Sequence, residues 1–186
     1  PTPADSLSDL ANADYFGRIA FADLPSTVQY SNQQGLSFYG AQDIDSAAPT
    51  GTQTVTLDWT GLNISGLNNI NMSWFVAEDD AAPGFEDWDA TDSFMLSIQV
   101  DGGGYTPVFA IEAEEFPAGD QVNNAPRVDT NFDGIGDGVE ITDVFTQFST
   151  AIPSGSTLDT RLTIDQFNAL DEDIAFDNLL VTADQP

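Results

Sequence analysis

The segment from Asp129 to Glu140, DTNFDGIGDGVE, has the residue types and the spacing of a calcium-binding loop. It matches the pattern D-x-[DN]-x-[DN]-G-x5-E at every specified position. In such a loop, positions 1, 3 and 5 supply side-chain oxygens, position 7 a carbonyl, position 9 a water-mediated contact and position 12 a bidentate carboxylate. The predicted calcium ligands are Asp129, Asn131, Asp133, Ile135, Asp137 and Glu140. The alternative interpretation is a plain turn, which Asp and Gly also favour.

Two further groups of acidic residues are candidate metal sites. The stretch 78–92 holds seven acids in fifteen residues, and closely packed carboxylates favour a bound cation. Its candidate ligands are Glu78, Asp79, Asp87 and Asp89. The alternative there is a solvated acidic loop. The other group joins two distant segments, which meet if the first and last strands are neighbours, and its candidate ligands are Asp43, Asp45, Asp173 and Asp177.

The elements that position these residues are predicted to be strands. Apolar residues alternate with polar ones in 55–59, 94–100 and 158–165, the period-two pattern of half-buried strands, and 101–104 is a hairpin signal. In 174–181 the alternation changes phase near Asp177 and Asn178, which indicates a bulge. With further segments at 15–22, 36–41, 69–78, 105–115 and 142–149, we expect an all-β fold: an antiparallel, jelly-roll-like β-sandwich of about nine to eleven strands.

The predicted strands also change the interpretation of the calcium loop. Pro126 disfavours a helix before the loop, and a β-branched and aromatic stretch follows it. We therefore expect the loop to lie between strands and to act as a structural staple, not as a sensor. In domain terms we predict an N-terminal arm or linker at 1–13, a single sandwich domain at 14–183 and a C-terminal tail at 184–186.

Charge and composition exclude several classes of function. The net charge is −28, with 31 acids against three arginines and no lysine, so electrostatic binding of nucleic acid or of anionic lipid is excluded. No apolar run is long enough to insert in a membrane. Calcium loops of extracellular modules bind at about 10⁻⁴–10⁻³ M, a concentration found outside cells, so we predict a secreted, extracellular or cell-surface protein.

Catalysis is not expected from this composition. The chain contains no His, Cys or Lys, which removes imidazole bases, thiol nucleophiles and Schiff bases. Paired-carboxylate glycosidase chemistry remains chemically available. The acids, however, cluster in loops that look like metal sites, so we predict a protein without enzymatic activity.

Sugar binding would need exposed aromatic side chains. The candidates are Trp88 in the acidic loop, Tyr39 and Tyr105, with Trp59 as a fourth that could equally be core. Trp74 lies in a stretch that is typical of a buried strand. Trp88 could instead cover a metal site.

The order of five segments, DYFGR, AQDID, the acidic loop, DTNFDGIGDG and DEDIAFDNLLVT, resembles jelly-roll modules of secreted marine bacterial proteins. The closing strand is similar to that of calcium-bearing carbohydrate-binding modules. The resemblance implies a structural calcium held by residues such as Asp43 and Asp177. It fixes neither a glycan nor a protein partner.

The sequence as a whole predicts a secreted, calcium-binding adhesive or structural module, such as a subunit of a surface or fibre assembly that contacts copies of itself. The alternative is a calcium-stabilised carbohydrate-binding module that recognises a polysaccharide.

Overall fold

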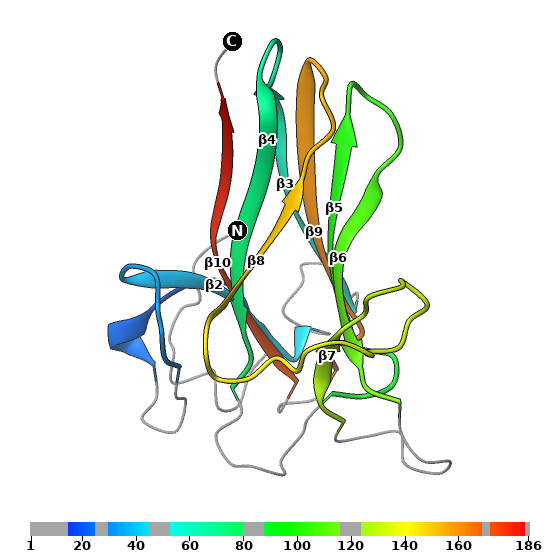
Figure 1. The fold of residues 1–186 in the computed structure, drawn as a ribbon. Helices are drawn as coiled ribbons and strands as arrows, with labels where there is room; N and C mark the ends of the chain where they lie inside the picture. The colour runs from blue at the N-terminus through cyan, green and yellow to red at the C-terminus, as the bar shows by residue number, and fades with distance from the viewer. Residues whose placement is uncertain are drawn as a thin grey trace.

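The protein is an antiparallel β-sandwich in the computed structural model, which describes residues 15–24, 30–44, 53–79, 88–115, 124–168 and 172–184 (Figure 1). The described residues form ten strands and one short 3-10 helix, η2 (Phe21–Asp23). The strands are β1 (Tyr15–Ala20), β2 (Ser37–Gln42), β3 (Thr54–Asn63), β4 (Asn68–Ala77), β5 (Ser93–Val100), β6 (Thr106–Ala113), β7 (Pro126–Val128), β8 (Thr146–Ala151), β9 (Thr157–Asp165) and β10 (Asp173–Asp184). In this part of the chain, none of the helical structure is long and apolar enough to span a membrane.

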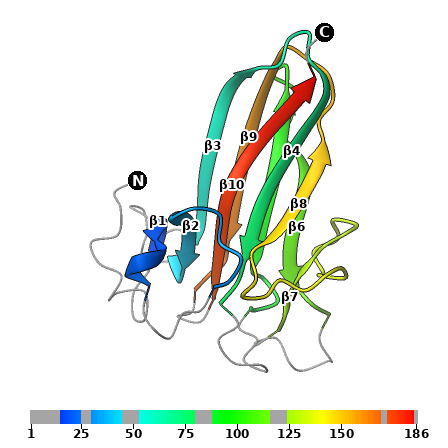
Figure 2. The same ribbon diagram turned by 60° about the vertical axis from the view of Figure 1, so that its left-hand side comes forward.

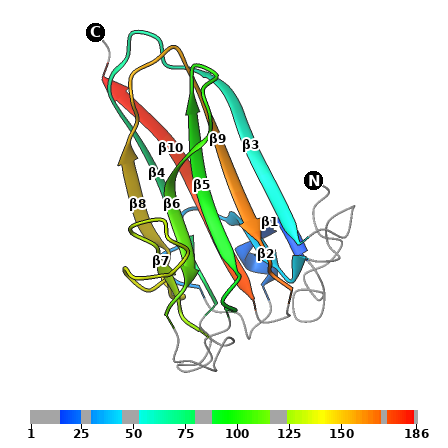
Figure 3. The ribbon, with the colours of Figure 1, turned by 90° about the vertical axis from the view of Figure 1, so that its right-hand side faces the viewer.

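The strand order is that of a jelly roll, which confirms the predicted fold class. One sheet has the order β1-β2-β10-β4-β8 and the other β3-β9-β5-β6-β7, with every pairing antiparallel. The chain passes repeatedly from one sheet to the other, so that β2-β10-β4-β8 faces β3-β9-β5-β6. Figure 3 faces the second sheet, with β3 at one edge.

The main core lies between the two sheets and follows the alternation seen in the sequence. In β9 every second residue is buried, and Leu158, Leu162 and Ile164 are each at most 2% exposed. Trp74 of β4, predicted to be core, is 1% exposed and packs against Phe109 of β6 with 5.2 Å between ring centroids. Burial of these apolar faces is the main force that holds the sheets together.

A second, smaller core covers the opposite face of the first sheet. Trp74 and Val76 of β4 point into the main core, whereas Phe75 between them packs on the other side with Phe38 of β2 and Phe145. This outer cluster consists of Ile19, Phe38, Phe75, Ala77, Phe145 and Ala175, with Phe21, Leu24 and Tyr30 against it. Figure 2 shows β1, β2 and η2 beside the lower half of β10. The side chains of the outer cluster pack these elements against the sheet.

The predicted bulge is present in β10. The register between β10 and β4 shifts between Asp177 and Leu180, and Asn178 has φ 53°. Asn tolerates this left-handed conformation better than most residues. The strand continues to Asp184, whose carboxylate accepts a hydrogen bond from the Asn69 amide (2.8 Å), so the first residue of the predicted C-terminal tail belongs to the sheet. The predicted N-terminal arm lies outside the described residues.

Candidate functional sites

The loop at 129–140 follows β7 and folds back on the edge of the second sheet (Figure 1). Backbone hydrogen bonds hold it there: the Asp129 N–H donates to the Ala110 carbonyl (3.0 Å) and the Gly136 N–H donates to the Ala113 carbonyl (2.9 Å). At Gly136 a Cβ atom would lie 2.4 Å from the Glu112 carbonyl oxygen, so only glycine allows this approach. The loop lies between strands and has no flanking helix, as the sequence predicts.

Asp129 organises the first half of the loop. It is 2% exposed; its Oδ1 accepts the N–H groups of Asn131 (3.1 Å) and Phe132 (2.6 Å), and its Oδ2 accepts the Gly134 N–H (2.9 Å). Asp133 Oδ2 in turn accepts a hydrogen bond from the Asn131 side-chain amide (3.0 Å). Three of the predicted ligands are thereby drawn together around one turn.

The second half of the loop has a different arrangement. Asp137 Oδ1 accepts both the N–H and the hydroxyl of Thr130 (2.8 Å each), and these bonds lower the pKa of Asp137. Glu140 forms an ion pair with Arg127, which also binds Glu114 through Nε (2.7 Å). The predicted closing ligand is therefore engaged by a cation of the protein. Among the described residues no three acidic side chains are clustered as a metal site, so calcium here stays a prediction that requires Glu140 to exchange Arg127 for the metal.

The other two predicted metal sites contact each other through Asp79 and Asp173 at one end of the sandwich. β2 and β10 are neighbours, as the second site requires: Gln42 lies opposite Asp173, and the Asp43 N–H donates to the Glu172 carbonyl (3.3 Å). Asp45 lies outside the described residues, and Asp177 lies further along β10, where the bulge begins.

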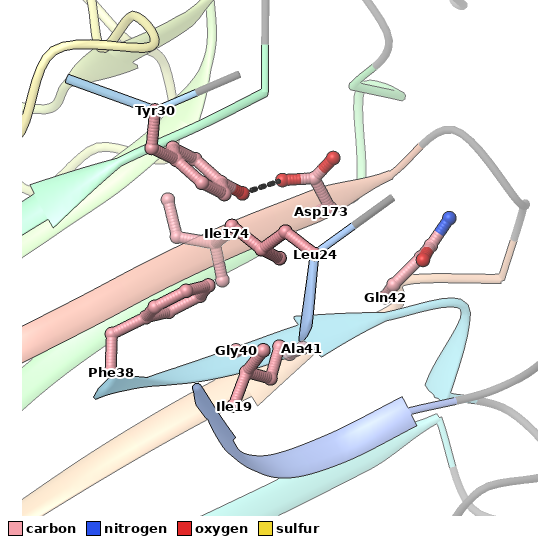
Figure 4. Close-up of a pocket in the computed structure, with 9 residues that line it drawn as sticks. All are labelled: Ile19, Leu24, Tyr30, Phe38, Gly40, Ala41, Gln42, Asp173 and Ile174. Carbon is pink, nitrogen blue, oxygen red and sulfur yellow. Dashed lines mark hydrogen bonds between the residues drawn. The ribbon is translucent and has the colours of Figure 1, made fainter. Parts of the chain in front are cut away.

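Asp173 instead contacts a member of the third predicted site. Its Oδ1 accepts the Asp79 N–H (3.2 Å) and the Tyr30 hydroxyl (3.0 Å; Figure 4). Burial, reinforced by the charge of Asp173, raises the pKa of Tyr30 well above its ordinary value, so Tyr30 stays a hydrogen-bond donor. Beside it lies a cavity of about 20 Å³, bordered also by Ile19 and Phe38, which has room for one water molecule.

Asp89 of the third site contacts a buried acid, Asp92, that was not among the predicted ligands. Asp92 is fully buried, its Oδ2 accepts the Asp89 N–H (2.6 Å), and Oδ1 has no hydrogen-bond partner in the described part of the chain. Glu172, equally buried, accepts the Asn168 N–H. Burial, together with the charges of Glu172 and Asp89, raises the pKa of Asp92 to about 9. Glu78 is also buried, at 1% exposed, and Asp87 lies outside the described residues.

Trp88 is not an exposed platform for sugar, and that interpretation is wrong. The side chain is fully buried, and its Nε1–H donates to the Asp173 carbonyl (3.2 Å). The indole packs edge-on against Phe167, with 4.8 Å between ring centroids. Its acidic neighbours in the sequence suggested exposure, but the indole fills the base of the main core between β10 and the segment after β9. Among the other candidates, Tyr105 is half-buried beneath the Arg161 guanidinium, 4.3 Å from its ring centroid.

Tyr39 and Trp59, by contrast, line one open groove of about 270 Å³. Tyr39 comes from β2 and Trp59 from β3, so the groove lies where the two sheets meet at one side of the sandwich. Arg18 of β1 and the bulge residues Asp177 and Asn178 of β10 complete its polar part. The sequence named the two rings separately, but nothing in it showed that they share a groove.

The fold and these sites define a jelly-roll β-sandwich module with carboxylate-rich loops. No protein-family model matches the chain, and no curated protein matches it in sequence. Among solved structures it is similar to three adhesin domains of Lys-gingipain. The K2 cleaved adhesin domain is 15% identical, with TM-score 0.41 over 92% of this chain and 90% of that one. The K3 and K1 domains, from Porphyromonas gingivalis W83, are each 11% identical, with TM-scores of 0.39 (90% of both chains) and 0.38 (94% and 95%).

Likenesses as distant as these leave the assignment of function to the chain's own residues.

Proposed function

We propose that this protein is a secreted, non-catalytic adhesive module whose calcium loop presents a contact surface to other copies of the chain. The supporting observation is that the loop at 129–140 combines acidic ligands with exposed apolar side chains. Phe132 is 47% exposed, Ile135 40% and Val139 56%, three of the seven large hydrophobic side chains that are exposed in the described part of the chain. Exposed apolar groups gathered on one loop are typical of an interaction site.

Backbone strain at Phe132 links the two features. Phe132 has φ 60°, an unfavourable conformation for a bulky aromatic residue, and the Asp129 carboxylate holds it by accepting its N–H. A calcium ion on Asp129, Asn131 and Asp133 would therefore fix the backbone that carries the exposed ring. The same ion would neutralise carboxylates that otherwise repel an approaching copy.

The charge of the chain makes such association depend on cations. Two copies at −28 each repel one another strongly, and this repulsion weakens only with screening or bound divalent ions. We propose no catalytic role, because the chain has no His, Cys or Lys and the acids Glu78, Asp92 and Glu172 are each buried.

The experiment measures stability and molar mass in 1 mM calcium and in EGTA. With a dissociation constant of about 10⁻⁴ M, calcium should stabilise the fold by about 1.4 kcal/mol, or roughly 3–6 °C in Tm. Asp129→Ala should abolish this gain, whereas Asp23→Ala, which removes an exposed acid of η2, should keep it. Light scattering should show association of the parent in calcium and its loss in Phe132→Ser, with the calcium-dependent Tm gain retained.

Calcium binding by the loop and self-association of the chain can be refuted separately. A parent protein that melts identically in calcium and in EGTA would show that the loop is an ordinary turn. A parent that gains stability with calcium yet stays monomeric at concentrations up to the millimolar range would refute the self-adhesive role alone.

A further inference from the structure

The groove beside Tyr39 and Trp59 arises from the way β2 leaves β10. The two strands pair only from Tyr39 to Gln42, opposite Asp173 to Phe176. Beyond Phe176 the pairing with β2 ends, the bulge follows between Asp177 and Leu180, and a space of about 270 Å³ is bordered by Ser37 and Asn178. At about 270 Å³ the groove lies just below the range of roughly 300–1,000 Å³ that is typical of sites for drug-sized ligands, so it suits a ligand of about one sugar ring.

Two aromatic rings form the apolar walls of the groove, and each is supported from behind. Trp59 packs against Phe176 with 6.0 Å between ring centroids, and Tyr39 packs against Phe16 at 6.1 Å. Both rings are only half-buried, so part of each ring remains accessible. A ring fixed in this way offers a flat apolar surface without further loss of side-chain entropy.

The polar groups of the groove include both donors and acceptors. Arg18 is exposed and oriented by a hydrogen bond from its Nε to the Ser37 hydroxyl (2.8 Å). Asp177 Oδ1 accepts the Asn178 N–H (2.7 Å), while its Oδ2 is shielded from solvent and has no hydrogen-bond partner among the described residues. The Asn178 side chain is exposed and supplies both a donor and an acceptor.

We propose that this groove binds a neutral sugar, with Trp59 and Tyr39 against its C–H faces and the exposed Arg18 and Asn178 side chains bonding its hydroxyl groups. A sugar ring matches the groove because it has apolar faces and an edge of hydroxyl groups that both donate and accept. The ligand is neutral because a chain of charge −28 repels acidic glycans, and one arginine beside one aspartate leaves no excess of positive charge in the groove. This site is independent of the calcium loop and of self-association.

The test begins with the full chain on an array of neutral oligosaccharides of glucose, galactose, mannose, xylose and fucose, with sulfated and uronic-acid glycans alongside. A neutral hit is then titrated in solution. Trp59 is the probe, because the other two tryptophans, Trp74 and Trp88, are at most 1% exposed. The bound sugar should therefore protect the accessible tryptophan fluorescence from acrylamide quenching.

Variants test whether the sugar binds in this groove. Trp59→Ala and Arg18→Ala should each weaken binding about tenfold or more, which corresponds to about 1.4 kcal/mol. Tyr105→Ala removes a half-buried tyrosine outside the groove and should leave the affinity unchanged. Arg18 is exposed, so its variant tests the groove even if Trp59→Ala fails to fold. The proposal is overturned if the parent binds no neutral glycan, binds only acidic ones, or binds a neutral glycan as well after Arg18→Ala as before it.

Discussion

Replacing Glu112 with glutamine should stabilise this protein at neutral pH. Glu112 lies on β6 and is 9% exposed, and burial, followed by the charges of Asp129 and Asp165, raises its pKa from 4.5 to about 8. At pH 7 the folded chain therefore holds a proton on Glu112 that the unfolded chain has released. Glutamine has nearly the same shape and is neutral at every pH. The substitution therefore removes the free-energy cost of taking up this proton on folding.

The magnitude follows from the two pKa values. Because the folded pKa is raised, stability from this group is fully present below pH 4.5 and is lost as the pH rises towards 8. Each pH unit in that interval costs about 1.4 kcal/mol, so the penalty at pH 7 is about 3 kcal/mol. For a domain of this size, the Gln variant should melt roughly 6–12 °C higher than the parent at pH 7.

The assay is urea unfolding followed by tryptophan fluorescence in EGTA, at several pH values from 4.5 to 8. Glu112→Gln should match the parent near pH 4.5 and gain steadily above it, whereas Glu115→Gln, at an exposed position three residues away, should show no such trend. Calcium should shrink the gain if the ion binds Asp129 and neutralises its charge. A gain that is independent of pH, or a variant less stable than the parent at pH 7, would refute the reasoning.

Three further predictions concern the acidic end and the calcium loop. Asp92→Asn should raise Tm at pH 8 and not at pH 4, because burial raises the pKa of Asp92 to about 9; equal shifts at both pH values would contradict this. Arg127→Gln should strengthen calcium binding in calorimetry by releasing Glu140 to the loop, and weaker binding would mean that Glu140 is not a ligand. Gly136→Ala should cost about 1–3 kcal/mol in urea unfolding, because its Cβ meets the Glu112 carbonyl, and a neutral effect would show that the loop moves easily from β6.

Features governed by local pattern could be predicted from the sequence. The alternation in 94–100 and 158–165 corresponds to β5 and β9, since strands buried on one face repeat every two residues. The phase change near Asp177 marks a real bulge, and Pro126 correctly excluded a helix before the loop. The predicted strand at 142–149 was less accurate, because β8 begins only at Thr146.

Features that depend on which loops meet could not be predicted in this way. Asp92 and Glu172 are eighty positions apart in the sequence; Asp92 precedes β5 of the second sheet and Glu172 precedes β10 of the first, so only the packing of the two sheets brings them together. Trp88 was misjudged for the same reason: its neighbours in the sequence are acids, but its contacts in space are Phe167 and the backbone of Asp173. Exposure is set by the whole fold, and sequence neighbours report it poorly when a short segment crosses the base of a core.

The position of β10 within its sheet has a mechanical consequence. Residues 173–176 of the strand pair with β2, and from Ala175 the strand also pairs with β4, a pairing that continues to the hydrogen bond between Asn69 and Asp184. A pulling force applied beyond Asp184 along the strand axis would therefore load these backbone hydrogen bonds in shear, many at a time, whereas an edge strand peeled sideways loses them one by one. A module tethered through this strand would resist tension along an element that is paired on both of its sides near Phe176.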